Sequence, residues 1–287
     1  MKNGIRSILG DEHRHNAATK LSRAAHLAAL HAHRTALLES PRYADQKRLL
    51  KFGHRVYSQS DEDGILQEIF RRIGTKSRSF IEIGSGNGLE NNTLYLLVQG
   101  WRGIWIEASS KKVIAARNTV ARFAGETSLR IEQQRVSAEN VDSLLGRLAS
   151  DSEVDLLSVD IDGNDFYILQ AIRSVSPRVV VCEYNAKFPP NLSWVMEYDA
   201  SHHWNGTDYF GASLKALELL LGGKGYALVG CNLLGCNAFF VRKDLASESL
   251  FYSPFTAENH YEPARYFLLA AYQSGFPAGF GPFRSFG

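Results

Sequence analysis

The segment SFIEIGSGNGLENNT, residues 79–93, decides the fold. It begins as a short apolar run with one carboxylate, Glu82, inside it, and continues into three glycines at alternate positions and a cluster of small polar side chains. Glycine lets the backbone turn sharply at the carboxyl end of a strand, and it lets a ligand approach more closely than a β-carbon would permit. The segment therefore predicts a strand followed by a loop that receives a nucleotide-like ligand.

The segments on either side of this loop predict the rest of a sheet. YSQSDEDGILQEIFRRIG (57–74) predicts a helix that is capped by Ser58 or Ser60 and ends at Gly74. Short strands that alternate with helices are typical of a parallel sheet with helices on both faces. YALVGCNLLGCNAFFVRKD (226–244), which follows a helix predicted over 211–225, indicates an antiparallel terminal hairpin. The further strands are predicted in residues 103–109, 129–137, 154–162 and 178–185.

Acidic residues near the glycine loop narrow the class of ligand. A dinucleotide fingerprint of the form G-x-G-x-x-G would require glycine at position 89, where the chain has Leu89. Pyrophosphate binds at a helix N-terminus without nearby negative charge, so Glu82 favours a ligand that carries an amine or a sulfonium. Glu107 ends the next strand, where a carboxylate can accept both hydroxyls of a ribose. An NAD(P)-dependent oxidoreductase is therefore a disfavoured alternative, also because of the terminal hairpin.

These motifs resemble the class I S-adenosylmethionine (SAM)-dependent methyltransferases, and more narrowly the FkbM-like family. The resemblance runs from about Tyr57 to Asp244 and rests on FIEIGSGNG, GIWIEAS, LLSVDIDGND, VVVCEYN and GYALVGCNLLGCNAFFV. It implies an α/β fold with a Rossmann-like, seven-stranded, mostly parallel sheet whose last strand is antiparallel. It also implies SAM over the glycine loop and methyl transfer to an oxygen nucleophile. The residues expected at the cofactor are Glu82, Gly84, Ser85, Gly86, Asn87, Gly88, Asn92, Glu107, Ala108, Ser137 and Asp160.

Polar side chains follow the predicted fourth and fifth strands, outside whose carboxyl ends ligands bind in open α/β sheets. Asp160, Glu183 and Asn185 look similar to the metal ligands of several O-methyltransferases, and they could hold Mg²⁺, which would orient a hydroxyl and lower its pKa. Without a metal, one side chain must act as general base, and the candidates are Asp160, His203 and its neighbour His202. Turn formation and helix capping are the alternative explanation of these acids.

The ends of the chain differ from its middle, so we divide it into residues 1–56, 57–250 and 251–287. Residues 1–55 carry eleven Lys and Arg against four Asp and Glu, in a loose helical pattern. We expect a basic helical extension with a solvated or dimer-forming face rather than a site for a polyanion. The C-terminal segment is dense in Phe and Tyr, which predicts packing on the methyltransferase domain or on a partner subunit.

We therefore expect a SAM-dependent O-methyltransferase that acts on a hydroxyl of a sugar, glycan or natural product. Nothing approaches the apolar length of about 18 residues that a membrane span needs, and residues 1–16 lack the apolar centre of a secretory signal, so we expect a cytoplasmic protein. DIDGND stands where a nucleic-acid methyltransferase would have N-P-P-[YF], which disfavours a nucleic-acid partner. A non-catalytic SAM-binding or interaction module is the remaining alternative, and a homodimer stays open.

Overall fold

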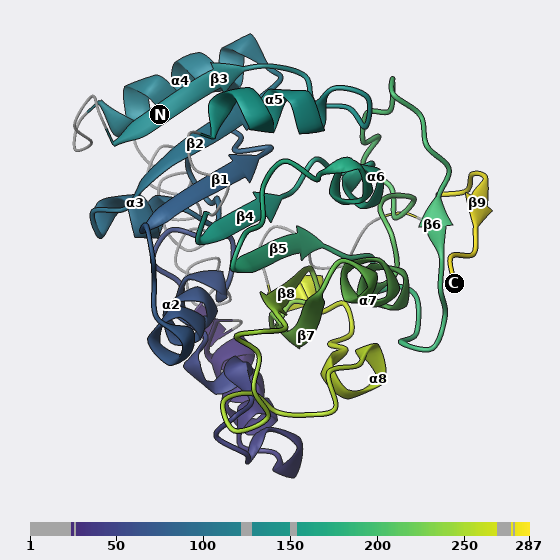
Figure 1. Ribbon diagram of the computed structural model, residues 1–287. Helices are drawn as coiled ribbons and strands as arrows, with labels where there is room; N and C mark the ends of the chain where they lie inside the picture. The colour runs from purple at the N-terminus through teal and green to yellow at the C-terminus, as the bar shows by residue number, and fades with distance from the viewer. Residues whose placement is uncertain (1–23, 26, 122–127, 150–153, 269–276, 278) are drawn as a thin grey trace, which may run out of the picture. The chain divides into compact units, whose positions relative to one another are not determined.

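The computed structural model describes all residues except 1–23, 26, 122–127, 150–153, 269–276 and 278 (Figure 1). The chain forms two compact units, Met1–Asp45 and Gln46–Gly287. In the first unit, residues 27–38 are helical, and the 3-10 turn η1 covers Pro41–Tyr43. The second unit contains the sheet. None of the helices in the described part of the chain is both long enough and apolar enough to cross a membrane.

Seven strands form one sheet in the second unit, in the order β3-β2-β1-β4-β5-β8-β7 (Figure 1). Strand β8 runs antiparallel to both of its neighbours, and the pairs among β1 to β5 are parallel. The strands are β1 (Ser79–Ile83), β2 (Arg102–Glu107), β3 (Leu129–Gln133), β4 (Leu156–Val159), β5 (Val179–Glu183), β7 (Tyr226–Cys231) and β8 (Asn237–Arg242). The predicted Rossmann-like, mostly parallel sheet with an antiparallel terminal hairpin is confirmed. The strand order reverses between β1 and β4, which is where open α/β sheets bind ligands.

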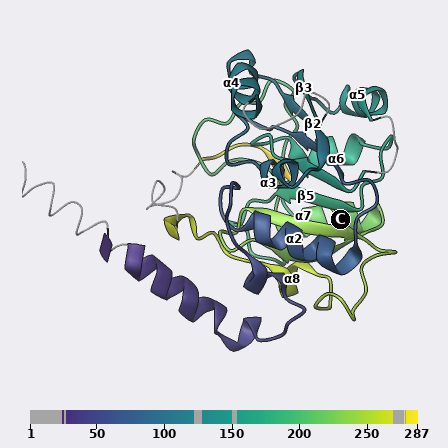
Figure 2. The same ribbon diagram turned by 90° about the vertical axis from the view of Figure 1, so that its left-hand side faces the viewer.

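Helices cover both faces of this sheet. Helices α2 (Glu62–Ile73), α3 (Leu94–Val98) and α4 (Ser110–Val120) lie on one face, and α5 (Val141–Leu148), α6 (Asp165–Ala171) and α7 (Leu214–Gly223) lie on the other (Figures 1 and 2). The second set packs with Ile81, Leu157 and Val180 in the main apolar core. Because helices cover both faces, β4 and β7 are buried along their whole length and consist mostly of apolar residues. The remaining elements are η2 (Leu49–Phe52), α8 (Ala257–His260) and η3 (Tyr266–Leu268).

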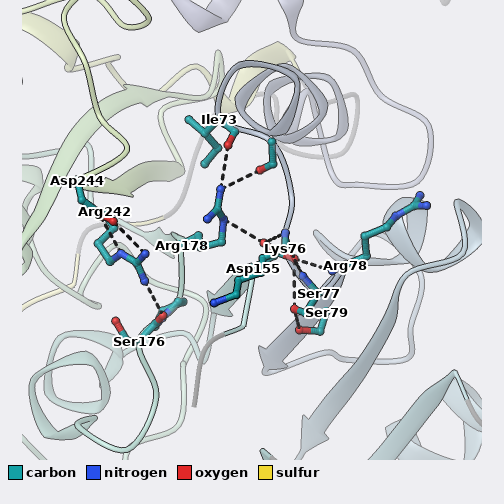
Figure 3. A network of polar contacts seen from close by, with 12 residues as sticks. Ile73, Lys76, Ser77, Arg78, Ser79, Asp155, Ser176, Arg178, Arg242 and Asp244 are labelled. Carbon is teal, nitrogen blue, oxygen red and sulfur yellow. Dashed lines mark hydrogen bonds and ion pairs between the residues drawn. The ribbon is translucent and has the colours of Figure 1, made fainter. Parts of the chain in front are cut away.

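A buried polar network lies at the amino ends of the parallel strands (Figure 3). Asp155, which precedes β4 and is fully buried, accepts hydrogen bonds from the amide groups of Lys76, Ser77 and Arg78 at 2.6 to 3.1 Å. Arg178 Nε lies 3.1 Å from Asp155 Oδ1, and its guanidinium donates to the carbonyl of Ile73 at 2.8 Å. The network therefore joins the end of α2 to the starts of β1, β4 and β5.

The end of the chain packs on the long connection between β5 and α7. Strand β9 (Phe283–Arg284) pairs antiparallel with β6 (Val195–Met196). Phe286 contacts Phe166 of α6 edge to face, with the ring centroids 4.9 Å apart. The amide of Gly279 donates to Asp208 Oδ1 at 2.6 Å. The C-terminal residues thus pack against this connection on its side away from the sheet (Figure 1).

Candidate active site

A cavity of about 410 Å³ opens at the carboxyl ends of β1, β2 and β4, where the strand order reverses. Gly84, Glu107 and Asp160 line it from the three strand ends. Residues 134–136, after β3, and residues 202–204, from the connection before α7, form its other walls. A cavity of this size suits a small-molecule ligand or cofactor.

The glycine loop beside this cavity depends on left-handed backbone conformations. Gly84 has φ = +88° and Gly88 has φ = +76°, a region that other residues rarely adopt. A β-carbon on Gly84 would lie 1.6 Å from the carbonyl oxygen of Asp160, and one on Gly88 would lie 2.6 Å from the Trp105 ring. By contrast, a β-carbon on Gly86 would meet open space. Positions 84 and 88 therefore require glycine for both conformation and packing.

Glu107, at the end of β2, lies in the cavity wall with its carboxylate held by the backbone. Its Oε2 accepts a hydrogen bond from the amide of Gly86 at 2.9 Å, and its Oε1 accepts one from the amide of Ser109 at 2.8 Å. A carboxylate offers about four lone-pair sites, so each oxygen can accept one more hydrogen bond. The side chain is thus oriented to receive two hydroxyl groups from a ligand in the cavity.

Glu82 and Asn92, both expected at the cofactor, lie behind the glycine loop and do not line the cavity. Glu82 accepts hydrogen bonds from the amide of Asn92 at 2.9 Å and from the hydroxyl of Thr93 at 2.5 Å. The Asn92 side chain donates to Ser158 Oγ at 3.1 Å. Burial raises the pKa of Glu82 to about 7. These two residues therefore fasten the start of α3 to β1 and β4.

Five other residues expected at the cofactor are not among the residues that line the cavity: Ser85, Gly86, Asn87, Gly88 and Ser137. Ser85 is buried, and its Oγ has no hydrogen-bond partner in the described part of the chain. Asn87 is exposed, and its side chain accepts a hydrogen bond from the amide of Leu89. Ser137 donates its amide to Asn140 Oδ1. Of the expected cofactor residues, those that line the cavity are Gly84, Glu107, Ala108 and Asp160.

Three carboxylates converge beside the cavity at the ends of β4 and β5. One oxygen atom from each of Asp160, Asp162 and Glu183 lies within 4.8 Å of the others. Burial raises the pKa of both Asp160 and Glu183 well above the usual range, and repulsion from the neighbouring acids adds to the effect. Glu183 Oε2 has no hydrogen-bond partner in the described residues. Such a group of acids retains protons or attracts a cation.

Asn185, expected as a metal ligand with Asp160 and Glu183, is engaged elsewhere. Its amide donates to the carbonyls of Asp208 at 2.9 Å and Phe210 at 3.0 Å, and its Oδ1 accepts from the amide of Lys187 at 3.2 Å. It therefore holds the connection before α7, and Asp162 supplies the third carboxylate of the cluster. Asp162 was not preferred as a metal ligand from the sequence, because an Asp-Gly pair is typical of a turn.

Comparison with known proteins identifies the family. Residues 54–216, more than half of the chain, match the model of the methyltransferase FkbM domain. The chain belongs to the FkbM methyltransferase family. It is thus a SAM-dependent methyltransferase, as the sequence motifs predict. No curated protein matches this methyltransferase significantly.

Solved structures of several methyltransferases are similar to this chain at low sequence identity. The N-terminal domain of EvdMO1 with S-adenosylhomocysteine (SAH) bound has a TM-score of 0.44 and 14% identity, over 65% of this chain and 82% of that chain. Magnesium protoporphyrin IX methyltransferase from Synechocystis PCC 6803, with bound SAH, has a TM-score of 0.41 and 12% identity, over 67% of this chain and 90% of that chain. The O-methyltransferase from Bacillus cereus in complex with SAH has a TM-score of 0.35 and 17% identity, over 57% of this chain and 67% of that chain.

The residues that line the cavity of this methyltransferase suit SAM. Glu107 offers two acceptors to a ribose, at the place where the glycine loop allows close approach. The cavity is lined by three acids, Glu107, Asp160 and Asp162, and by two basic residues, Lys112 and Arg135. An ionised carboxylate among these acids would attract the sulfonium of SAM. The residues present therefore fit the methyl donor of the family.

The two histidines line the cavity, but each uses its Nε2 within the protein. Arg135 lies 3.3 Å from His203 Nε2, and because a guanidinium only donates, that nitrogen must accept and the ring proton must sit on Nδ1. His202 Nε2 lies 3.3 Å from the carbonyl oxygen of Asp162, to which it can only donate. Neither Nε2 is therefore free to take a proton from a ligand. Sequence reasoning had not singled out Arg135, which follows β3 as one exposed arginine among many.

Proposed function

We propose that this SAM-dependent methyltransferase methylates a hydroxyl oxygen of a sugar, glycan or natural-product acceptor. The observation that carries the proposal is Asp160, a carboxylate of raised pKa in the wall of the cofactor cavity. A hydroxyl becomes a good nucleophile only as its proton leaves, so an oxygen acceptor needs a base beside the methyl donor. A carboxylate of raised pKa serves this purpose better than an ordinary exposed one.

The binding roles follow from which residues face the cavity. Bound SAM would supply a methyl group already activated on a sulfonium. Glu107 would accept the ribose hydroxyls, and the backbone at Gly84 would allow the cofactor close to the sheet. Ala108 would pack against the nucleoside. Ser85, Gly86, Asn87, Gly88 and Ser137 would shape the surrounding loops, with Glu82 and Asn92 holding those loops from behind.

Asp160 is the proposed general base, and its neighbours set its basicity. Burial, together with repulsion from Asp162 in the same 4.8 Å cluster, disfavours the loss of its proton. His203 is the other candidate base, and its engagement by Arg135 favours Asp160. The substrate hydroxyl would lie between this carboxylate and the methyl group, in line with the bond that breaks.

Mg²⁺ is an alternative use of the same acids. Oxygen atoms of Asp160, Asp162 and Glu183 are close enough to share one ion, and carboxylate oxygens are its usual protein ligands. Asn185, with its side chain bonded to backbone groups, would not join them without rearrangement. A bound ion would lower the pKa of the acceptor hydroxyl and reduce the need for a base.

The test is transfer of a labelled methyl group from SAM to a panel of sugars, glycosides, phenols and aliphatic alcohols. We expect a labelled ether product, and we expect Asp160→Asn to reduce transfer by about 100-fold or more. SAH binding to this variant should change by less than about fivefold. Asp244→Asn, which alters an exposed acid paired with Arg242, is the matched control.

Two outcomes would contradict the proposal. A labelled amine, without any labelled ether, would exclude the hydroxyl acceptor. Unchanged transfer by Asp160→Asn would exclude that residue as the base. Activity that is lost in EDTA and restored by Mg²⁺ would select the metal alternative.

A further inference from the structure

We propose that Arg135 is a positioning residue that fastens residues 199–204, the cover loop, as a wall of the cofactor cavity. The inference rests on the proposed SAM site and extends it to a segment more than 60 residues away along the chain. Residues 202–204 line the cavity, although the loop belongs to the connection between β6 and α7. Its position therefore depends on contacts with the strand ends.

Arg135 makes three of these contacts with one guanidinium. Its Nη2 donates to the carbonyl oxygens of Ala200 at 2.9 Å and His202 at 3.0 Å, and its Nη1 lies 3.3 Å from His203 Nε2. The backbone of Arg135 is itself held, because Asn140 donates its side-chain amide to the Arg135 carbonyl at 2.9 Å. The planar fork of arginine can reach all three acceptors, which a lysine ammonium would do less well.

The turn after β4 makes a second, independent set of contacts with the cover loop. The Asn164 side chain donates to the carbonyl of Asp199 at 2.7 Å, and His202 Nε2 lies 3.3 Å from the carbonyl of Asp162. Gly163 packs so closely that a β-carbon there would lie 2.4 Å from His202 Cδ2. The loop thus rests directly on the turn that carries the carboxylate cluster.

Residues 202–204 of the cover loop line the same cavity as the proposed ribose ligand. Glu107, the proposed ribose ligand, and Ala108 belong to the same cavity as residues 134–136 and the cover loop. Without the guanidinium, the carbonyls of Ala200 and His202 would lose a charged donor, and the loop would be held only at the turn. Arg135 is exposed, so its removal takes little packing from the core. We therefore expect its loss to affect cofactor retention more than folding.

The test measures SAH affinity by calorimetry and SAH release by stopped flow in Arg135→Ala and Arg135→Lys. We expect the alanine variant to bind SAH about tenfold more weakly, mainly through faster release, because it loses hydrogen bonds from a charged donor. The lysine variant should recover part of the loss. The matched control is Arg130→Ala, which removes an exposed arginine of β3 that pairs with Glu132.

Two further readouts separate positioning from general loss of structure. Amide hydrogen exchange in residues 199–204 should become faster in Arg135→Ala, and that of β4 should not change. Gly163→Ala should also speed SAH release, because the added methyl group displaces His202 without altering any charge.

The outcomes distinguish the two proposals. Failure of the wild-type protein to bind SAH would contradict the proposed function itself. Wild-type binding, together with unchanged affinity, release and exchange in Arg135→Ala, would overturn only the role of Arg135.

Discussion

Burial determines which acids of the glycine-loop region can face a ligand. Glu82 and Glu107 both lie in adjacent strands, and the sequence indicated a cofactor role for each. Glu82 pairs in register with Trp105, so the two side chains lie on the same face of the sheet. Glu82 accepts a hydrogen bond from Thr93, the residue before α3, which places this face under α3. Glu107 lies at the end of its strand and reaches the cavity. The sequence reveals the strand and the glycines, but it does not show that residues 91–93 fold back onto Glu82.

The raised pKa of Glu82 predicts a pH-dependent stability. Its pKa of about 7 in the folded protein exceeds the usual value of about 4.3, so the folded state binds the proton more tightly than the unfolded state. Its contribution is fully present below about pH 4 and is lost as the pH rises through 7. From pH 5 to pH 8, the free energy of unfolding should therefore fall by up to about 3 kcal/mol through this residue.

Urea unfolding of the wild type and Glu82→Gln between pH 5 and pH 8 checks this prediction. In the variant, the free energy of unfolding should lack the decrease with pH that Glu82 causes. The variant should therefore gain stability relative to the wild type toward pH 8. Glu90→Gln, which alters an exposed glutamate, is the control and should keep the wild-type profile. Parallel profiles for the wild type and Glu82→Gln would show that Glu82 is not protonated in the folded protein.

At the scale of helices and strands, apolar periodicity predicted the type of each central element, while side-chain contacts set the ends. Helix α2 was expected to start at Ser58 or Ser60, and it starts at Glu62, with Asp61 as the N-cap residue. The Asp63 carboxylate accepts hydrogen bonds from the amides of residues 56–58, which bends this segment across the helix start. An acid in the first turn usually interacts with its own helix, so this contact could not be predicted.

The network at the amino ends of the strands predicts a large effect of Asp155→Ala on stability. The change would leave three partly buried amide groups without their acceptor and Arg178 without its carboxylate (Figure 3). Breaking a buried ion pair by removing one partner typically costs about 3 to 5 kcal/mol, and we expect a loss in this range.

Chemical denaturation of Asp155→Ala and of the surface control Asp244→Ala measures this effect. The control should lose less than about 1 kcal/mol, because exposed ion pairs contribute little. Folded Asp155→Ala should still bind SAH, since the network lies at the opposite ends of the strands from the cavity. A loss below about 1 kcal/mol for Asp155→Ala would contradict a structural role for the network.

Across the whole molecule, the sequence predicted what depends on neighbouring residues and missed what depends on distant ones. The sheet, the reversed strand β8 and the family follow from local motifs. The cover loop does not, because its contacts join Arg135 to residues 65 to 68 positions later in the chain. The density of Phe and Tyr predicted that the C-terminal segment packs against other parts of the protein. The sequence does not show that it packs against α6 and β6, because these contacts join residues far apart in the chain.

The packing of the chain end predicts different effects for two phenylalanines of that segment. Phe286 contacts Phe166 in α6, and Phe280 is 93% exposed. We expect Phe286→Ala to lower the free energy of unfolding by about 1 to 3 kcal/mol, through lost apolar burial and an aromatic pair. Phe280→Ala should change it by less than about 0.5 kcal/mol. Equal effects in thermal or urea unfolding would show that the C-terminal residues do not pack on the body as described.

The measurement that bears most directly on the proposed methyltransferase site is calorimetric titration with SAH of the wild type, Glu107→Gln and Glu107→Ala. We expect micromolar binding by the wild type, weaker binding by Glu107→Gln and no detectable binding by Glu107→Ala, because the alanine removes both acceptors for the ribose. Thermal unfolding of each variant verifies that it is folded. Absence of binding by the wild type, or equal affinity in folded Glu107→Ala, would contradict a SAM site at the carboxyl ends of β1 and β2.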